Sequence, residues 1–185
     1  MIEFLIKILV VILLALFFVF RNKFTGYYKK SSFRFLIKYF IITIVLLFYF
    51  SGIMDFASIS FNIYLRLLLG LLLIFGGYSL FFVAHKHLGQ NWSTLLDKKI
   101  SKKDRLIKTG PYKYVRHPSY SASILALIGF GILTANWIIF SICFLVLLIF
   151  YIYKVPREEK FLTEKFGKEY IDYRKKTPGF FPRLK

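Results

Sequence analysis

Residues able to do polar chemistry gather in two short runs of this 185-residue sequence. The first is Gly-Pro-Tyr-Lys-Tyr-Val-Arg-His-Pro-Ser-Tyr at 110–120, and the second is Lys-Val-Pro-Arg-Glu-Glu-Lys-Phe-Leu at 154–162. In the first run, Pro118 keeps His117 out of helical geometry and sets the start of a helix. The first turn of that helix should offer unpaired N–H groups and a positive dipole end beside Arg116. This pattern predicts a site for an anionic group.

The second run places two adjacent carboxylates, Glu158 and Glu159, at the end of an apolar segment in a chain with only nine acidic residues. We expect them to open an amphipathic cytoplasmic helix, because negative charge is favourable near a helix N-terminus. A functional role, in which a carboxylate meets a cationic ligand, stays open beside simple capping. The first run has an equally plain alternative, an interfacial aromatic belt with a snorkelling arginine.

Several other kinds of site are excluded because their patterns are missing. The sequence has no Gly-x-Gly-x-x-Gly after a strand and no P-loop, so neither of these phosphate-binding loops is expected. His85 and His87 are two residues apart, on different faces of a helix, so we expect no metal site. There is no Gly-x-Ser-x-Gly elbow, and the single cysteine, Cys143, should be an inert apolar residue.

The segments that must position the two runs are apolar and close to bilayer length. Charged residues make up 19% of the chain, below the roughly 25% of an average soluble protein. We predict an all-α integral membrane protein with a single membrane domain, a cytoplasmic ligand pocket and a C-terminal amphipathic helix. Its five transmembrane helices should lie at about 2–20, 35–54, 61–84, 120–135 and 137–153, the last two forming a short helical hairpin.

The positions of the basic residues predict the topology. The chain has 27 Lys and Arg against 9 Asp and Glu, and all the basic residues except Lys7 and Arg66 fall within 21–38, 85–118 and 154–185. Five spans with the N-terminus outside put these three segments on one side, which the positive-inside rule makes cytoplasmic. Because one topology accounts for the charge, a nucleic-acid partner is not expected.

The two runs occur in order with Gly-Gln-Asn-Trp-Ser at 89–93 and Phe-Gly-Lys-Glu-Tyr-Ile-Asp-Tyr at 166–173. With these motifs the chain resembles the isoprenylcysteine carboxyl methyltransferase family over about residues 80–183. That family belongs to a wider group that includes phospholipid N-methyltransferases. The resemblance implies S-adenosyl-L-methionine as methyl donor, S-adenosylhomocysteine as product, and 85–119 and 154–185 as cytoplasmic catalytic segments. It also implies a lipid-tailed or prenylated acceptor drawn from the lipid bilayer.

The resemblance assigns roles to individual residues. By motif position, the donor-binding residues are Asp97, Asp104, Arg105, Leu106, Ile107, Tyr112, His117, Pro118, Ser119, Tyr120 and Glu158. Four residues before the glutamate, where the family has an arginine for the substrate carboxylate, this chain has Lys154. Lysine keeps the charge but lacks the bidentate fork. Arg157 and Arg116 are the nearby cations expected to help position the acceptor carboxylate, and no metal is expected.

The implied reaction is methyl transfer to the carboxylate of an isoprenylated cysteine or a similar lipid-tailed acid. A sulfonium methyl is already activated and a carboxylate has no proton to lose, so positioning and partial desolvation suffice. A phospholipid amine or small thiol is the alternative acceptor, and it needs a base such as His117 or a glutamate. A non-catalytic membrane scaffold is a further alternative. A membrane sterol reductase using a nicotinamide cofactor ranks lowest because the chain is short.

Overall fold

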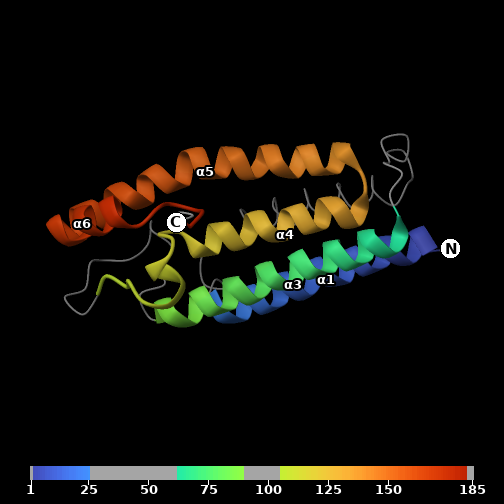
Figure 1. The fold of residues 1–185 in the computed structure, drawn as a ribbon, viewed down its shortest axis with the longest axis horizontal. Coiled ribbons are helices and arrows are strands. Elements are labelled where there is room, and N and C mark those ends of the chain that lie inside the picture. The colour runs from blue at the N-terminus through green and yellow to red at the C-terminus, as the bar shows by residue number, and fades with distance from the viewer. Residues whose placement is uncertain (1, 26–61, 90–104, 183–185) are drawn as a thin grey trace. The chain divides into compact units, whose positions relative to one another are not determined.

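The computed structural model of the chain describes residues 2–25, 62–89 and 105–182 (Figure 1). Over these ranges the chain forms helices, turns and irregular segments, with no β-strand, so the all-α prediction is confirmed for them. The expected span at 35–54 lies outside the described residues. The helices are α1 (Ile2–Thr25), α3 (Ile63–Leu88), the short 3-10 helix η4 (Gly110–Lys113), α4 (Pro118–Thr134), α5 (Trp137–Phe166) and α6 (Lys168–Lys176).

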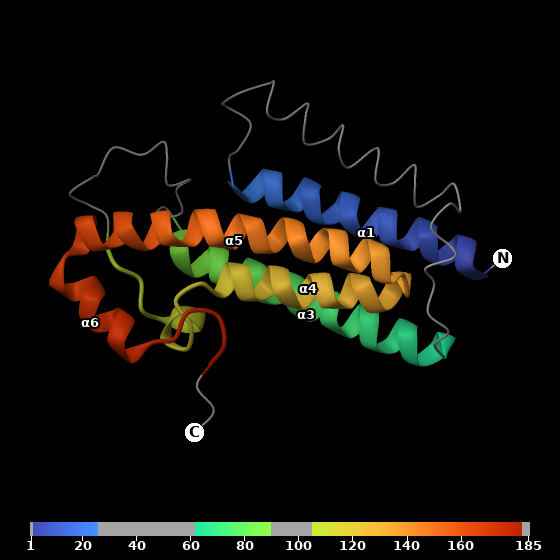
Figure 2. The same cartoon turned by 90° about the horizontal axis from the view of Figure 1, so that it is seen from above.

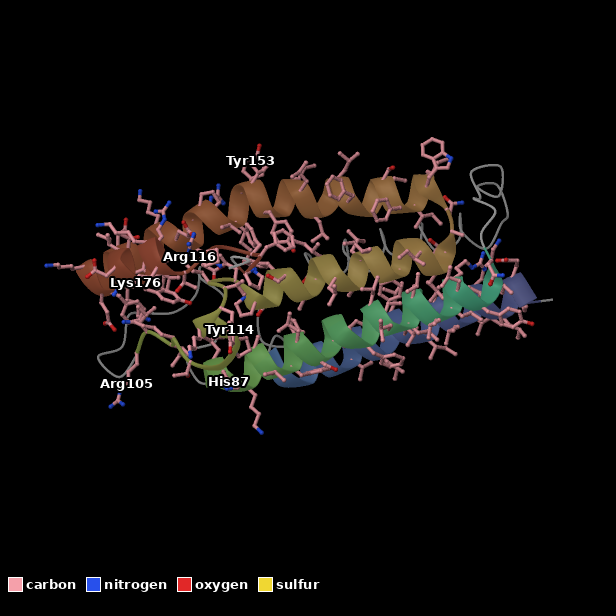
Figure 3. The ribbon with its side chains drawn as sticks, in the orientation of Figure 1. His87, Arg105, Tyr114, Arg116, Tyr153 and Lys176 are labelled. Carbon is pink, nitrogen blue, oxygen red and sulfur yellow. The ribbon has the colours of Figure 1, made fainter. Side chains whose placement is uncertain are left out.

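Two of the described helices, α3 and α5, are long and apolar enough to cross a membrane, and α4 is a shorter apolar helix. At about 1.5 Å per residue, the 26 residues of α3 exceed the length of a bilayer core. Large apolar side chains on both long helices are exposed, among them Leu72 and Phe75 on α3 and Leu145 and Ile149 on α5. Such surfaces suit contact with lipid. Tyr153, at the end of the apolar part of α5, points outward from the helix (Figure 3).

The chain divides into two compact units, and α3, α4 and α5 each contribute residues to both. The first unit comprises Met1–Leu72 and Ile128–Ser141. In it, the buried Arg66 of α3 pairs with Glu3 of α1 at 2.7 Å, which accounts for one of the two cations outside the basic segments. Gly70 packs closely on α4, because an added Cβ would lie 3.1 Å from the Gly129 carbonyl oxygen.

The second unit, Leu73–Leu127 and Ile142–Lys185, carries both polar runs. Gly77 of α3 lies very close to α4. An added Cβ would be 2.7 Å from the Ala122 carbonyl oxygen, which is too close for any residue with a Cβ. The first half of α4 runs beside α5 (Figures 1 and 2), and the Tyr151 hydroxyl donates to the Tyr120 carbonyl at 2.7 Å. These contacts bring the start of α4 to the polar part of α5.

The path of α5 corrects the sequence prediction. We expected an apolar helix ending near 153 and a new helix opened by Glu158 and Glu159, but α5 is continuous to Phe166. It passes through Pro156, although proline removes a backbone donor and destabilises a helix interior by about 3 kcal/mol. Contacts beyond the proline hold the helix, since Glu159 is bound to residues at the start of α4. The carboxylates therefore lie inside a helix, and the dipole argument for them is wrong.

Gly167 marks the true end of α5. Its φ of +52° is in the left-handed region, where glycine is favoured over residues with a Cβ. The chain then turns into α6, which runs at an angle to α5 (Figure 2). This turn places two buried tyrosines of α6, Tyr170 and Tyr173, beside the polar run at 110–120.

Candidate active site

A cavity in the second unit is lined by both polar runs and by α6. Its walls come from the end of α3, the segment before α4, the start of α4, the charged part of α5 and α6. The lining residues are Leu88, Arg105, Leu106, Ile107, Tyr112, Arg116, His117, Pro118, Ser119, Tyr120, Lys154, Glu158, Phe161, Leu162, Lys165, Phe166, Tyr170 and Tyr173.

The structure brings together nine of the eleven residues that the sequence assigned to donor binding, from Arg105 to Glu158. The other two, Asp97 and Asp104, lie outside the described residues. Of the three cations assigned to the acceptor, Lys154 and Arg116 line the cavity. Arg157 is exposed and is not part of the lining.

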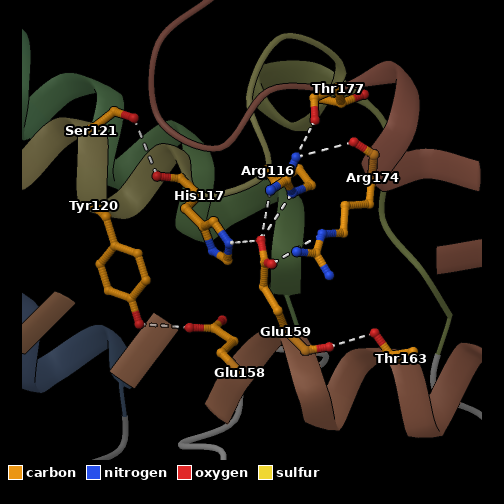
Figure 4. Close-up of polar contacts among 9 residues, drawn as sticks. All are labelled: Arg116, His117, Tyr120, Ser121, Glu158, Glu159, Thr163, Arg174 and Thr177. Carbon is orange, nitrogen blue, oxygen red and sulfur yellow. Dashed lines mark hydrogen bonds and ion pairs between the residues drawn. The ribbon is translucent and has the colours of Figure 1, made fainter. Parts of the chain in front are cut away.

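Glu158 faces this cavity. The Tyr120 hydroxyl donates a hydrogen bond to Glu158 Oε2 at 2.6 Å (Figure 4). Lys154 stands one helical turn earlier on the same face of α5, with its Nζ 5.6 Å from the centre of the Tyr120 ring. A carboxylate and an ammonium group therefore line one cavity, and one aromatic side chain contacts both.

Glu159 is held by a cluster of three cationic or ionisable side chains, which we call the clamp: Arg116, His117 and Arg174. Arg116 donates from Nε and Nη2 to Glu159 Oε1 at 3.1 and 2.7 Å, and His117 Nε2 is 3.2 Å from the same oxygen. Arg174 Nε lies 3.3 Å from Oε2 (Figure 4). The hydrogen bond with His117, followed by those with Arg116, outweighs burial and lowers the pKa of Glu159 to about 2. Glu159 is therefore ionised throughout the neutral range.

The clamp also fixes the C-terminal segment onto the start of α4. A further donor of Arg116, Nη1, binds the Thr177 carbonyl. The backbone N–H groups of Arg116 and His117 donate to the carbonyls of Pro178 and Gly179, at 2.8 and 2.9 Å. Glu159 thus anchors side chains that tie together three separate parts of the chain.

The first turn of α4 offers fewer free N–H groups to an anion than the sequence predicted. The N–H groups of Tyr120 and Ser121 donate to the His117 carbonyl at 3.0 and 3.1 Å, and Pro118 has no N–H. Those donors are already used. The anionic group bound beside this helix start is the chain's own Glu159.

The segment before α4 reaches the cavity through η4. Gly110 has a φ of +58°, where glycine is favoured, and the His87 ring lies so close that an added Cβ would have to displace it. Figure 3 shows His87, Arg105 and Arg116 at this end of the unit. Tyr112 is buried, and its carbonyl accepts a hydrogen bond from the Tyr173 hydroxyl. His87 therefore contributes by packing against η4.

Sequence reasoning gave no role to the cavity residues at the end of α5 and on α6. A signal was present, because Leu162, Phe166 and Tyr170 recur at helical spacing, but we interpreted it only as an amphipathic helix. Tyr170 is only 1% exposed, and burial raises the pKa of its hydroxyl to about 12. A neutral phenol is therefore part of the cavity wall.

Several known proteins are similar to this chain in sequence or in fold. The chain is 34% identical to the cobalt-zinc-cadmium resistance protein CzcN of Cupriavidus metallidurans, over 45% of this chain and 38% of that protein. It is 35% identical to the protein-S-isoprenylcysteine O-methyltransferase of Schizosaccharomyces pombe, over 52% of this chain and 41% of the other. Its fold is similar to that of the eukaryotic intramembrane Ras methyltransferase ICMT, with a TM-score of 0.68 and 24% identity, over 84% of this chain and 55% of that one.

This chain thus spans about half, or less, of the length of the relatives it matches. Residues 65–169 match the phospholipid methyltransferase family. That range includes both polar runs and the cavity lining from Leu88 to Phe166. Since the match covers more than half of the sequence, the chain belongs to the phospholipid methyltransferase family.

Proposed function

We propose that this chain is an S-adenosyl-L-methionine-dependent methyltransferase acting on the carboxylate of an isoprenylated cysteine or a similar lipid-tailed acid. The observation that carries the proposal is the pairing of Glu158 and Lys154 in one cavity, with Tyr120 in contact with both. A carboxylate suits a cationic donor, and an ammonium group suits an anionic acceptor. The relatives named as isoprenylcysteine methyltransferases support this choice of acceptor.

The cavity residues fit the proposed donor, which when bound supplies a methyl group on a positively charged sulfur. Glu158, oriented by Tyr120, offers a negative charge to that ligand. The rings of Tyr112 and His117 offer flat surfaces to the ligand. The Tyr170 hydroxyl is a buried polar atom without a hydrogen-bond partner among the described residues, and a polar ligand would satisfy it.

We assign Lys154 the role of binding the acceptor carboxylate. Arg116 was the other lining residue expected to hold it, but its guanidinium makes four hydrogen bonds within the chain, two to Glu159 and two to backbone carbonyls. We therefore give Arg116 the task of holding the site together. A carboxylate acceptor needs no base, so orientation by Lys154 and exclusion of water are the contributions this chain must make.

An amine or small-thiol acceptor is the second candidate, because Lys154 lacks the bidentate fork of the arginine that the family uses for the acceptor carboxylate. Such an acceptor must lose a proton to a base. His117 is a poor choice for that base, since it is buried and its Nε2 already faces Glu159. The pH dependence separates the two cases: methylation of a carboxylate should be flat above about pH 5, whereas the rate with an amine should rise with pH.

We further propose that the N-terminus lies outside and that the cavity opens to the cytoplasm, where the donor is found. The basic segments at 85–118 and 154–185 support this orientation through the positive-inside rule. The acceptor's lipid tail would reach the cavity from the bilayer around α3 and α5. Labelling of a cysteine at position 175 only from the cytoplasmic side agrees with this topology, and labelling only from outside contradicts it.

The proposal can be tested on detergent-purified protein in two steps. Calorimetry with S-adenosylhomocysteine should show saturable binding, whereas a non-catalytic scaffold would show none. Turnover is then measured with a farnesylcysteine analogue and with its carboxamide, which has no nucleophilic carboxylate. We expect methyl ester from the acid alone. Methylation of phosphatidylethanolamine vesicles without methylation of the acid would support the second candidate.

A further inference from the structure

Tyr170 on α6 is the cavity residue whose chemistry the fold leaves unexplained. Its side chain is only 1% exposed, yet its hydroxyl makes no hydrogen bond within the described part of the chain. Burying a hydroxyl without a partner is unfavourable, and buried polar groups in native proteins are nearly always satisfied. A missing partner in a ligand cavity points to a group supplied from outside the chain.

Neighbouring residues do not fill this need. The guanidinium of Arg116 acts on the Tyr170 hydroxyl, but arginine only donates hydrogen bonds, so it can bind the phenol oxygen and cannot accept the phenol's proton. Tyr173, three residues later on the same helix and also buried, donates its own hydroxyl to the Tyr112 carbonyl. One tyrosine of α6 therefore has a partner within the fold, and the other does not.

We propose that the Tyr170 hydroxyl binds the methyl donor directly, donating a hydrogen bond to an acceptor atom of that ligand. This inference rests on the proposed function, because it names a further residue of the same site. The phenol keeps its proton at neutral pH, since burial raises its pKa to about 12. Tyr170 and Glu158, the carboxylate that we assign to the donor, line the same cavity.

The test compares Tyr170→Phe with Tyr173→Phe, a matched pair in which each change removes one buried hydroxyl and keeps the ring. Without ligand, Tyr170→Phe should keep the wild-type unfolding temperature or exceed it, whereas Tyr173→Phe should lower it because a hydrogen bond inside the fold is lost. With S-adenosylhomocysteine, Tyr170→Phe should weaken binding by about threefold to tenfold, the size of one neutral hydrogen bond. Tyr173→Phe should weaken binding less than Tyr170→Phe does, because the Tyr173 hydroxyl is bound to the Tyr112 carbonyl.

Three outcomes overturn the inference, and they can be told apart. If Tyr170→Phe destabilises the ligand-free protein or prevents folding, the hydroxyl has a structural role. If the wild-type protein binds S-adenosylhomocysteine and Tyr170→Phe binds it equally well, only the role of Tyr170 is wrong. If the wild-type protein binds neither this ligand nor S-adenosylmethionine, the proposed function fails as well.

Discussion

Glu158 and Glu159 are neighbours in sequence but belong to two different regions of the site. Glu158 lines the cavity, with Tyr120 and Lys154, where a ligand can reach it. Glu159 lies in the clamp, bound to Arg116 and His117, and its side chain is only 12% exposed. Successive residues of an α-helix point about 100° apart, so one turn of α5 serves both regions.

The difference shows that a charged residue near a candidate site need not bind the ligand. The Arg-His pair before α4 would suggest an anion-binding function, but the structure uses it to hold an internal carboxylate. Glu158, by contrast, has a phenol as its hydrogen-bond donor. We therefore expect changes in the clamp to affect stability first and changes in the cavity to affect binding first.

The largest expected effect on stability comes from Glu159→Gln. Removing one member of a buried ion pair leaves the guanidinium of Arg116 without its counter-charge, which typically costs about 3 kcal/mol or more. Denaturant unfolding in detergent should show this loss of unfolding free energy. Glu158→Gln is the matched control and should lose less than about 1 kcal/mol. Equal losses in the two variants would contradict the separate roles of the two carboxylates.

Acid should weaken the clamp over a defined range. The pKa of Glu159 falls from an ordinary 4.5 to about 2, so the unfolded chain takes up the proton at a higher pH than the folded one. The stabilisation is complete above about pH 5 and is lost as the pH falls towards 2, by about 3 kcal/mol at most. Unfolding temperatures at pH 6 and pH 3 should therefore differ more for the wild type than for Glu159→Gln. Parallel curves would contradict this assignment.

On the cavity side, Lys154→Ala should raise the acceptor Michaelis constant by about tenfold or more, the effect of a lost charged hydrogen bond. Donor affinity should stay within about twofold. Lys154→Arg should retain activity, because the guanidinium keeps the charge and adds a planar fork. If Lys154→Ala is harmless or increases activity, the acceptor is a cationic amine rather than a carboxylate, because the lysine would repel such an acceptor.

The smallest effect is expected at the surface pair between Lys108 and Glu169. Their charged atoms are 2.8 Å apart, but the side chains are 41% and 55% exposed. Exposed pairs contribute about 1 kcal/mol or less, so Glu169→Gln should scarcely change the free energy of unfolding. A loss as large as that of Glu159→Gln would show that burial does not distinguish the clamp from an ordinary ion pair.

Several features of this fold could be predicted from the sequence because strong local signals set them. The apolar block expected at 61–84 is found as Ile63–Leu88, and the one at 120–135 as Pro118–Thr134. Proline lacks an N–H, so it is well suited to the first position of a helix, and α4 begins there. The motif residues before α4 were likewise placed together, since they follow one another along the chain.

The end of α5 could not be predicted in this way, and only the family resemblance distinguished Glu158 from Glu159. Pro156 and the change from apolar to charged residues both signal a helix end, but contacts of Glu159 with the start of α4 keep the helix continuous. Which carboxylate faces the cavity depends on how the helix beyond that proline is rotated about its axis. The role of Tyr170 depends on the turn at Gly167, which sequence spacing alone does not fix.

The most direct test of the role of Glu158 is the affinity of Glu158→Gln for S-adenosylmethionine, measured by calorimetry at neutral pH beside the wild type. The unfolding temperature of each ligand-free protein is recorded as the control. Loss of a charged hydrogen bond is worth about 1.5–3 kcal/mol, so we expect binding at least tenfold weaker with the unfolding temperature unchanged. Wild-type affinity in Glu158→Gln, or weaker binding that merely follows a loss of stability, would contradict the assignment of this carboxylate to the donor.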